Sequence, residues 1–145
     1  MSQVWARDPY LPQTWPHLFT LPEANSLLPE VMPLLLELRS YKVTLDSALR
    51  ALSELTPVMR QNGHAAQARE LEARIQELTA ELAAGIDQLT TMGIDIKSLE
   101  HGLIDFPSLH EGRVVFLCWR LGEGPAIRFW HDIDAGFAGR QPLAN

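Results

Sequence analysis

Residues that can take part in acid–base or metal chemistry are concentrated in the last third of the chain, from Ile94 to Leu143. His131 and Asp134 stand three residues apart there, and Asp105 precedes them in an apolar stretch. An imidazole and carboxylates are ligands for a divalent metal and are also suited to proton transfer. One interpretation is therefore a small metal-assisted or acid–base enzyme centred on these three residues. Their spacing matches no known catalytic signature, so catalytic residues and any cofactor beyond a divalent metal stay unassigned.

The same segment also fits an interaction module or a binding surface for a small ligand. Aromatic side chains form apolar walls in such sites, and a few polar groups orient the ligand. We expect this surface to contain Asp105, Trp119, Glu123, Trp130, His131 and Arg140.

A simpler interpretation of the charged residues is that they pair with one another. Buried charges need partners, and two arginines, Arg128 and Arg140, are available to neutralise carboxylates. The acceptors would be Asp132, Asp134 or Glu123. In that case the cluster stabilises the fold and carries no chemistry.

Cys118 is the single cysteine of the chain, so neither an intrachain disulfide nor a multi-cysteine zinc site can form. It stands between Leu117 and Trp119, where a thiol behaves as a small hydrophobic group with a raised pKa. We expect it to be inert and to point to the face of the strand opposite His131.

A long helical hairpin over residues 21–92 is predicted to support this segment. Thr20 and Glu23 have the spacing of a capping box and Pro22 suits a first helical turn, so the helix begins near Leu21. Two further prolines, Pro29 and Pro33, predict a short helix, a bend and a longer helix beyond it.

Apolar residues at heptad spacing predict that the two helices of the hairpin pack along a coiled-coil seam. In the first helix the seam has the rows Val31, Leu38, Leu45, Leu52 and Leu34, Tyr41, Ala48, Leu55. In the second it has the rows Ala68, Ile75, Leu82, Leu89 and Leu71, Leu78, Gly85, Met92. Gly85 would allow a close approach of the helices.

After Gly93 the pattern changes to a period of two, which predicts a small three-stranded antiparallel β-meander. The expected strands are Gly102–Phe106, Arg113–Leu121 and Ala126–His131, with loops Pro107–Gly112 and Gly122–Pro125. Centring the strands on these loops places Asp105, Val115 and His131 in one row. The fold class is therefore α+β, with sheet and C-terminal tail in residues 94–145 and one domain over residues 19–145.

The middle strand is apolar on both faces, so both faces must be covered. The helices cover one face. The other must meet the extended Pro- and Trp-containing arm of residues 1–18, the C-terminal tail or a second copy, and an uncovered apolar patch favours a homodimer.

The net charge of −6 and the pI near 5.3 disfavour nucleic acid as a partner, because an acidic surface repels phosphate. No apolar stretch has the length of a membrane span and no secretory leader is evident, so we expect a cytoplasmic protein that does not bind membranes.

Four segments of the C-terminal part and one before the first helix carry a resemblance to a known family. They are Phe19–Asn25, Gly102–Pro107, Leu117–Glu123, Trp130–Asp132 and Gly136–Leu143. Together they resemble a bacterial family catalogued as domain of unknown function 2203, from about Phe19 to Leu143. The resemblance implies no activity. Its shared positions are Asp105, Cys118, Trp119, Arg120, Glu123, Trp130, His131, Asp132 and Arg140.

The function that the sequence favours is thus a cytoplasmic dimeric interaction or small-ligand-binding module that uses the C-terminal sheet. The metal-assisted enzyme is the first alternative. A second alternative is a helical-hairpin adaptor, in which the outer surface of the helices binds a partner.

Overall fold

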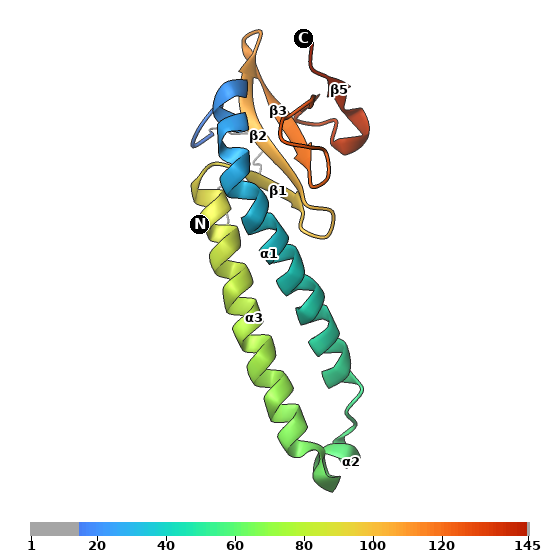
Figure 1. Cartoon of the computed structure of the whole chain (residues 1–145). Helices are drawn as coiled ribbons and strands as arrows, with labels where there is room; N and C mark the ends of the chain where they lie inside the picture. The colour runs from blue at the N-terminus through green and yellow to red at the C-terminus, as the bar shows by residue number, and fades with distance from the viewer. Residues whose placement is uncertain (1–14, 145) are drawn as a thin grey trace.

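The computed structural model describes residues 15–144 and has an α+β fold with a five-stranded antiparallel sheet in strand order β1-β2-β3-β4-β5 (Figure 1). The helical part consists of α1 (Leu21–Ser53), α2 (Pro57–Met59), the π-turn η2 (Arg60–His64) and α3 (Ala65–Thr91). The sheet part consists of β1 (Asp95–Ser98), β2 (Leu103–His110), β3 (Arg113–Arg120), β4 (Phe129–Asp132), the 3-10 turn η3 (Phe137–Gly139) and β5 (Gln141–Pro142).

Helix α1 begins where the sequence predicts it. The Thr20 hydroxyl accepts a hydrogen bond from the Glu23 backbone N–H, and the Glu23 carboxylate accepts one from the Thr20 backbone N–H. The predicted break at Pro29 and Pro33 is wrong, because α1 continues through both. Both prolines lie on the exposed side of the helix, where water can bond the carbonyl groups that lose their N–H partners.

Helices α1 and α3 lie side by side and antiparallel, and their far ends extend well beyond the sheet (Figure 1). Every residue of the four predicted seam rows is buried or half-buried. A Cβ atom on Gly85 would overlap the side chain of Leu38, so this glycine sets the close approach of the helices. The connection between the helices contains α2 and η2, which a simple hairpin turn lacks.

The sheet has two strands more than the predicted three-stranded meander. Strands β1 and β5 are short, and β5 contains a proline, so neither shows the alternation of a longer strand. Strand β2 continues through Pro107 instead of ending before it. The carbonyl of Pro107 accepts a hydrogen bond from the Phe19 N–H at 2.7 Å. The backbone polar groups of this position point away from β3, so a proline, which has no N–H, breaks no hydrogen bond between the two strands.

The register of the sheet differs from the predicted one, and the row of Asp105, Val115 and His131 is wrong. Glu111 and Gly112 form a two-residue turn in which both have positive φ, 51° and 79°. The turn is therefore tighter than the predicted loop. As a result Asp105 pairs with Cys118. In the separate pairing of β3 with β4, Val115 lies opposite Asp132 and Phe116 lies opposite His131.

The main core lies between the helices and one face of the sheet. Leu117 and Trp119 of β3 and Phe106 of β2 belong to it, together with residues of α1 and α3 such as Leu28 and Leu89. The core members of α1 and α3 lie in the halves of the helices nearest the sheet.

The second face of the sheet is also apolar at its centre, where Phe116 and Cys118 are fully buried. Among the described residues, the Trp15 ring meets Phe116 edge-on at 5.4 Å. Trp15 belongs to the predicted arm, and the arm residues before it lie outside the described part of the chain. The burial of Phe116 within one chain removes the argument for a dimer through this face.

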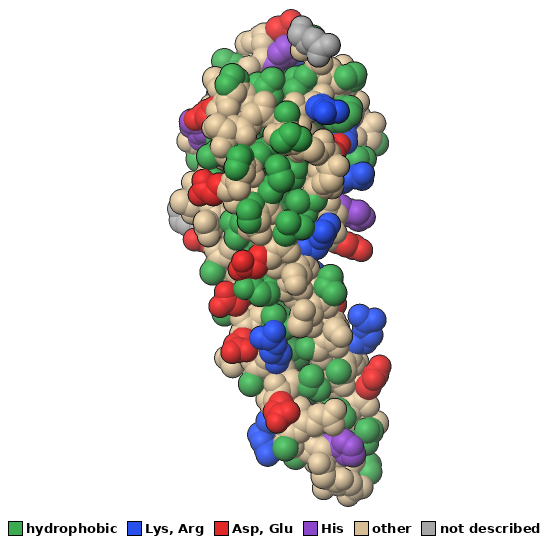
Figure 2. Space-filling model, in the orientation of Figure 1, with side chains coloured by type: hydrophobic (Ala, Val, Ile, Leu, Met, Phe, Trp, Pro, Cys, Tyr) green, Lys and Arg blue, Asp and Glu red, His purple; other side chains and the backbone are tan. Residues whose placement is uncertain are grey.

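On the face shown in Figure 2, charged side chains of both signs are scattered over the long helices and do not gather into a large patch of one sign. None of the helices in residues 15–144 combines the length and the apolar character needed to cross a membrane.

Candidate metal centre

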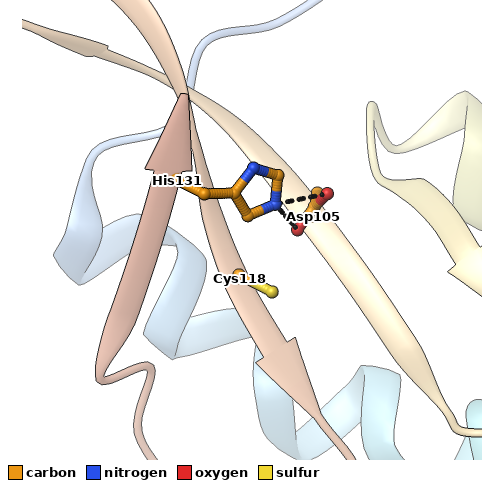
Figure 3. A group of neighbouring side chains, drawn as sticks. All are labelled: Asp105, Cys118 and His131. Carbon is orange, nitrogen blue, oxygen red and sulfur yellow. Dashed lines mark hydrogen bonds and ion pairs between the residues drawn. The ribbon is translucent and has the colours of Figure 1, made fainter. Parts of the chain in front are cut away.

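Three side chains of different chemistry meet on the face of the sheet that lies away from the helices. Asp105 of β2 and Cys118 of β3 are cross-strand partners, and His131 enters from β4. Figure 3 shows the His131 ring reaching across β3 toward Asp105, with Cys118 beside them. One ligand atom from each residue lies within 4.8 Å of the other two, and the residues are only 0–2% exposed. The cluster is therefore closed to bulk solvent.

Both ring nitrogens of His131 have partners. Nε2 lies 3.1 Å and 3.0 Å from the two carboxyl oxygens of Asp105, and Nδ1 lies 2.8 Å from the backbone oxygen of Asp132. A carbonyl oxygen only accepts hydrogen bonds, so Nδ1 carries a proton. Nε2 then either carries a second proton or offers a lone pair toward Asp105. The space between Nε2 and the carboxyl group thus holds a proton, and it is also where a cation would bind.

The surroundings of His131 favour its protonated form more than water favours that of a free imidazole. Burial lowers the pKa of His131, but the hydrogen bonds to Asp105 and to the Asp132 carbonyl, together with the Asp105 charge, raise it by more. The net result is a pKa above the ordinary value of 6.5. When His131 is protonated, its positive charge is neutralised by Asp105 within the buried site.

Cys118 is a protonated thiol in the metal-free protein. Burial raises its pKa to about 12, and the charge of Asp105 and a hydrogen bond with it act in the same direction. A thiol in this state is a poor nucleophile, and the nearest imidazole already faces a carboxyl group. A cation bound beside the sulfur would reverse this balance, because a coordinating thiol is deprotonated.

Lys97 of β1 brings a further charge to the rim of the cluster. Its ammonium nitrogen lies 2.8 Å from Asp95 Oδ2 and 4.0 Å from Asp105 Oδ2. It also lies over the Phe116 ring at 4.5 Å. Two carboxylates and two cations therefore balance in this region when His131 is protonated.

Glu123 and Arg140 form a second ion pair beside the cluster, with Arg140 Nη2 2.6 Å from Glu123 Oε1. The same oxygen accepts a hydrogen bond from the Arg120 backbone N–H at 2.7 Å. The guanidinium lies over Phe129 at 4.0 Å and over Phe137 at 4.6 Å. Its Nε is buried and has no hydrogen-bond partner among the described residues. This pair ties the turn after β3 to the C-terminal tail, which is the pairing that the sequence suggests for Arg140.

The six residues expected on one binding surface are divided between the two faces of the sheet. Trp119 is 1% exposed in the core on the helix side, and its Nε1 donates to the Gly124 carbonyl at 3.0 Å. Trp130 is half-buried and stacks at a tilt on the His110 ring, with centroids 5.4 Å apart. Asp105 and His131 lie on the opposite face. No single aromatic-walled surface therefore unites these residues.

The acidic residue expected beside His131 also differs from the one found there. Asp134 is not a member of the group whose ligand atoms converge, and Cys118 takes the third place. Asp132 contributes its backbone carbonyl, while its side chain pairs with Arg113 at 3.1 Å.

Sequence reasoning missed Cys118, Asp95 and Lys97. Cys118 was expected on the face opposite His131, which is wrong because both lie on the same face. A glycine at position 112 was the available signal, since a two-residue turn ending in glycine changes the register of β2 against β3. Asp95 and Lys97 could not be found, because the polar strand β1 was not expected.

The chain matches the family described as "Uncharacterized conserved protein (DUF2203)" over residues 17–143, which include every strand and long helix. No curated protein and no solved structure matches the chain. Since the match covers more than half of its length, the chain belongs to the DUF2203 family.

Proposed function

We propose that the protein is a metal-binding module that holds one divalent transition-metal ion between Asp105, Cys118 and His131. The observation that carries this proposal is the convergence of a carboxylate, a thiol and an imidazole within 4.8 Å in a buried site. Nitrogen, sulfur and oxygen ligands in one set suit zinc and similar borderline ions, whereas calcium and magnesium prefer oxygen ligands alone.

The orientation of His131 supports the proposal. Metal-binding histidines almost always donate their second N–H to a carbonyl or carboxylate, which fixes the ring and its tautomer. Here Nδ1 donates to the Asp132 carbonyl, and Nε2 faces the other two ligands. An incoming ion would replace the proton between Nε2 and Asp105 without any rotation of the ring.

The ligand of the binding module that the sequence predicts is then a metal ion. Its setting is the cytoplasm, because the reducing conditions there keep the Cys118 thiol free. Three protein ligands alone would leave a fourth position for water, as in catalytic zinc sites, so the metal-assisted alternative depends on whether that position is filled.

A titration with Zn²⁺ and with Co²⁺ tests the proposal. We expect one metal ion per chain, and for cobalt a thiolate charge-transfer absorption that Cys118→Ala abolishes and that His131→Ala weakens strongly. His110→Ala removes an exposed histidine of the same sheet and serves as the matched control, with unchanged stoichiometry. A wild-type protein that retains no stoichiometric metal after dialysis against buffered zinc would refute the proposal.

A second candidate function, partner binding by the outer surface of the helices, is supported by exposed apolar side chains. Leu36 and Val43 lie seven residues apart on α1, outside its seam, and are 49% and 65% exposed. Residues at this spacing share one face of a helix, and a second copy of the same chain would cover that face. This surface replaces the sheet face as the basis for the predicted homodimer.

Light scattering tests the homodimer. We expect the mass of a dimer for the wild-type protein and of a monomer for the double variant Leu36→Glu/Val43→Glu. Leu109→Glu, at a 60% exposed position of β2, should leave the dimer intact. A monomeric wild-type protein at high concentration would rule out this use of α1.

A further inference from the structure

We propose that Asp95 is the fourth ligand of the metal site and that Lys97 is a built-in cation which the incoming metal displaces from between Asp95 and Asp105. This inference rests on the proposed metal-binding function and specifies how the site is completed. It gives strand β1 a role in metal binding, although no residue of β1 belongs to the sequence motifs or to the three-residue cluster.

Asp95 lies on β1, beside the strand that carries Asp105. Strand β1 runs antiparallel to β2, and Asp95 is the cross-strand partner of Asp105. Side chains of directly opposed residues lie on the same face with Cβ atoms about 5 Å apart. Asp95 therefore lies on the same face as Asp105, beside the buried cluster. The Asp95 side chain is 24% exposed, whereas that of Asp105 is fully buried.

The ammonium group of Lys97 joins these carboxylates. Lys97 Nζ lies 2.8 Å from Asp95 and 4.0 Å from Asp105 and rests on the Phe116 ring. The ammonium group thus lies where the two carboxylates meet, which is also where a metal ion would bind. Asp95 is not among the residues whose ligand atoms lie within 4.8 Å of one another, so its side chain has to turn toward Asp105 to reach the ion once the ammonium has left.

The backbone at Lys97 is irregular. The pairing of β1 with β2 is regular at Ile96 and then shifts by one residue before Ser98, so Lys97 stands at a β-bulge. Bulges occur next to functional sites, where they change the direction of a side chain. The bulge lets Lys97 stand at the rim of the cluster, and the side chain is 34% exposed. It can therefore move into water when the metal enters.

The charges make Lys97 a competitor of the metal. Without the metal, Lys97 is the cation beside Asp95 and Asp105. A divalent ion brings two positive charges to these carboxylates where the ammonium brings one, so the ion has to expel Lys97 in order to bind. Four protein ligands close the zinc site, which is typical of structural and storage sites and leaves no position for a substrate.

A double-mutant cycle on zinc affinity, measured by competition with a chelator, tests the inference. Lys97→Met should raise affinity by roughly tenfold, because it removes a cation a few ångströms from the ion. Asp95→Asn should lower affinity by more than about tenfold. It should do so in the Lys97→Met background as well, because a ligand acts independently of the lysine. Lys42→Met and Asp46→Asn, which break an exposed ion pair on α1, are matched controls and should change nothing.

The outcomes separate this inference from the proposed function. If Asp95 only holds Lys97, Asp95→Asn will have no effect once Lys97 is methionine, and the inference is wrong while the three-ligand site remains. An unchanged affinity in Lys97→Met would also contradict the displacement. If the wild-type protein binds no zinc at all, the proposed function fails and this inference fails with it.

Discussion

Replacing Asp105 with alanine is expected to lower the free energy of unfolding of the metal-free protein by about 3–5 kcal/mol. Asp105 is fully buried, and its Oδ2 lies 3.0 Å from His131 Nε2. Its removal leaves a buried imidazole without that partner and opens a cavity beside Cys118. The measurement is chemical denaturation in the presence of a chelator. The exposed pair on α1 gives the comparison, because Asp46→Ala should cost only about 0.5 kcal/mol.

Asp105→Asn is the conservative variant that separates charge from hydrogen bonding. Because His131 Nδ1 already donates to the Asp132 carbonyl, a neutral imidazole has its lone pair on Nε2. The amide of asparagine can donate to that lone pair, so the variant keeps a hydrogen bond without charges. We expect it to be much more stable than the alanine variant. An equal loss in both variants would show that charge, and not the hydrogen bond, holds this pair.

The pH dependence gives an independent check on the same pair. The pKa of His131 is raised in the folded state, so its contribution to stability is fully present below the unfolded value of about 6.5. It is lost as the pH rises through the folded pKa, because the folded protein then releases the proton that the unfolded chain has already lost. Wild-type stability should therefore fall over this range, and Asp105→Asn should remove the fall. A wild-type profile that rises with pH there would contradict the assignment of the proton.

Much of the helical part follows from the sequence because its determinants are local. The Thr20–Glu23 cap, the first turn at Leu21 and the heptad rows depend on residues three to seven positions apart. The continuity of α1 through Pro29 and Pro33 does not, because it depends on packing of the buried face against α3 and the sheet.

The candidate site shows why sheet register limits prediction. The predicted loop placed Asp105 opposite Val115, whereas the two-residue turn places it opposite Cys118, three residues away. A shift by an odd number of residues moves a side chain to the other face relative to its partner strand. The pairing of β3 with β4 is shifted by an odd number as well, so the two errors cancel for Asp105 and His131. They do not cancel for Cys118, which is why the thiol was missing from the predicted centre.

Zinc affinity is expected to rise by about 100-fold per pH unit in weakly acidic solution, because binding displaces two protons. One is the proton between His131 and Asp105, which the raised pKa of His131 retains to above pH 6.5. The other is the thiol proton of Cys118, whose pKa of about 12 keeps it in place across the whole range. Above the pKa of His131 only the thiol proton remains to be displaced, so the slope should fall to about tenfold per pH unit.

Chelator competition from weakly acidic to weakly alkaline pH measures this slope, and calorimetry in buffers of different ionisation enthalpy counts the released protons directly. Cys118→Ser is the informative variant. Its hydroxyl oxygen is a weak zinc ligand that keeps its proton, so the slope should fall to about tenfold per pH unit in weakly acidic solution and nearly vanish above the pKa of His131. A wild-type slope that stays near tenfold at all pH values would show that one of the two residues does not bind the ion. A slope near zero at all pH values would show that the ion binds outside this cluster, because binding at exposed carboxylates displaces no buried proton.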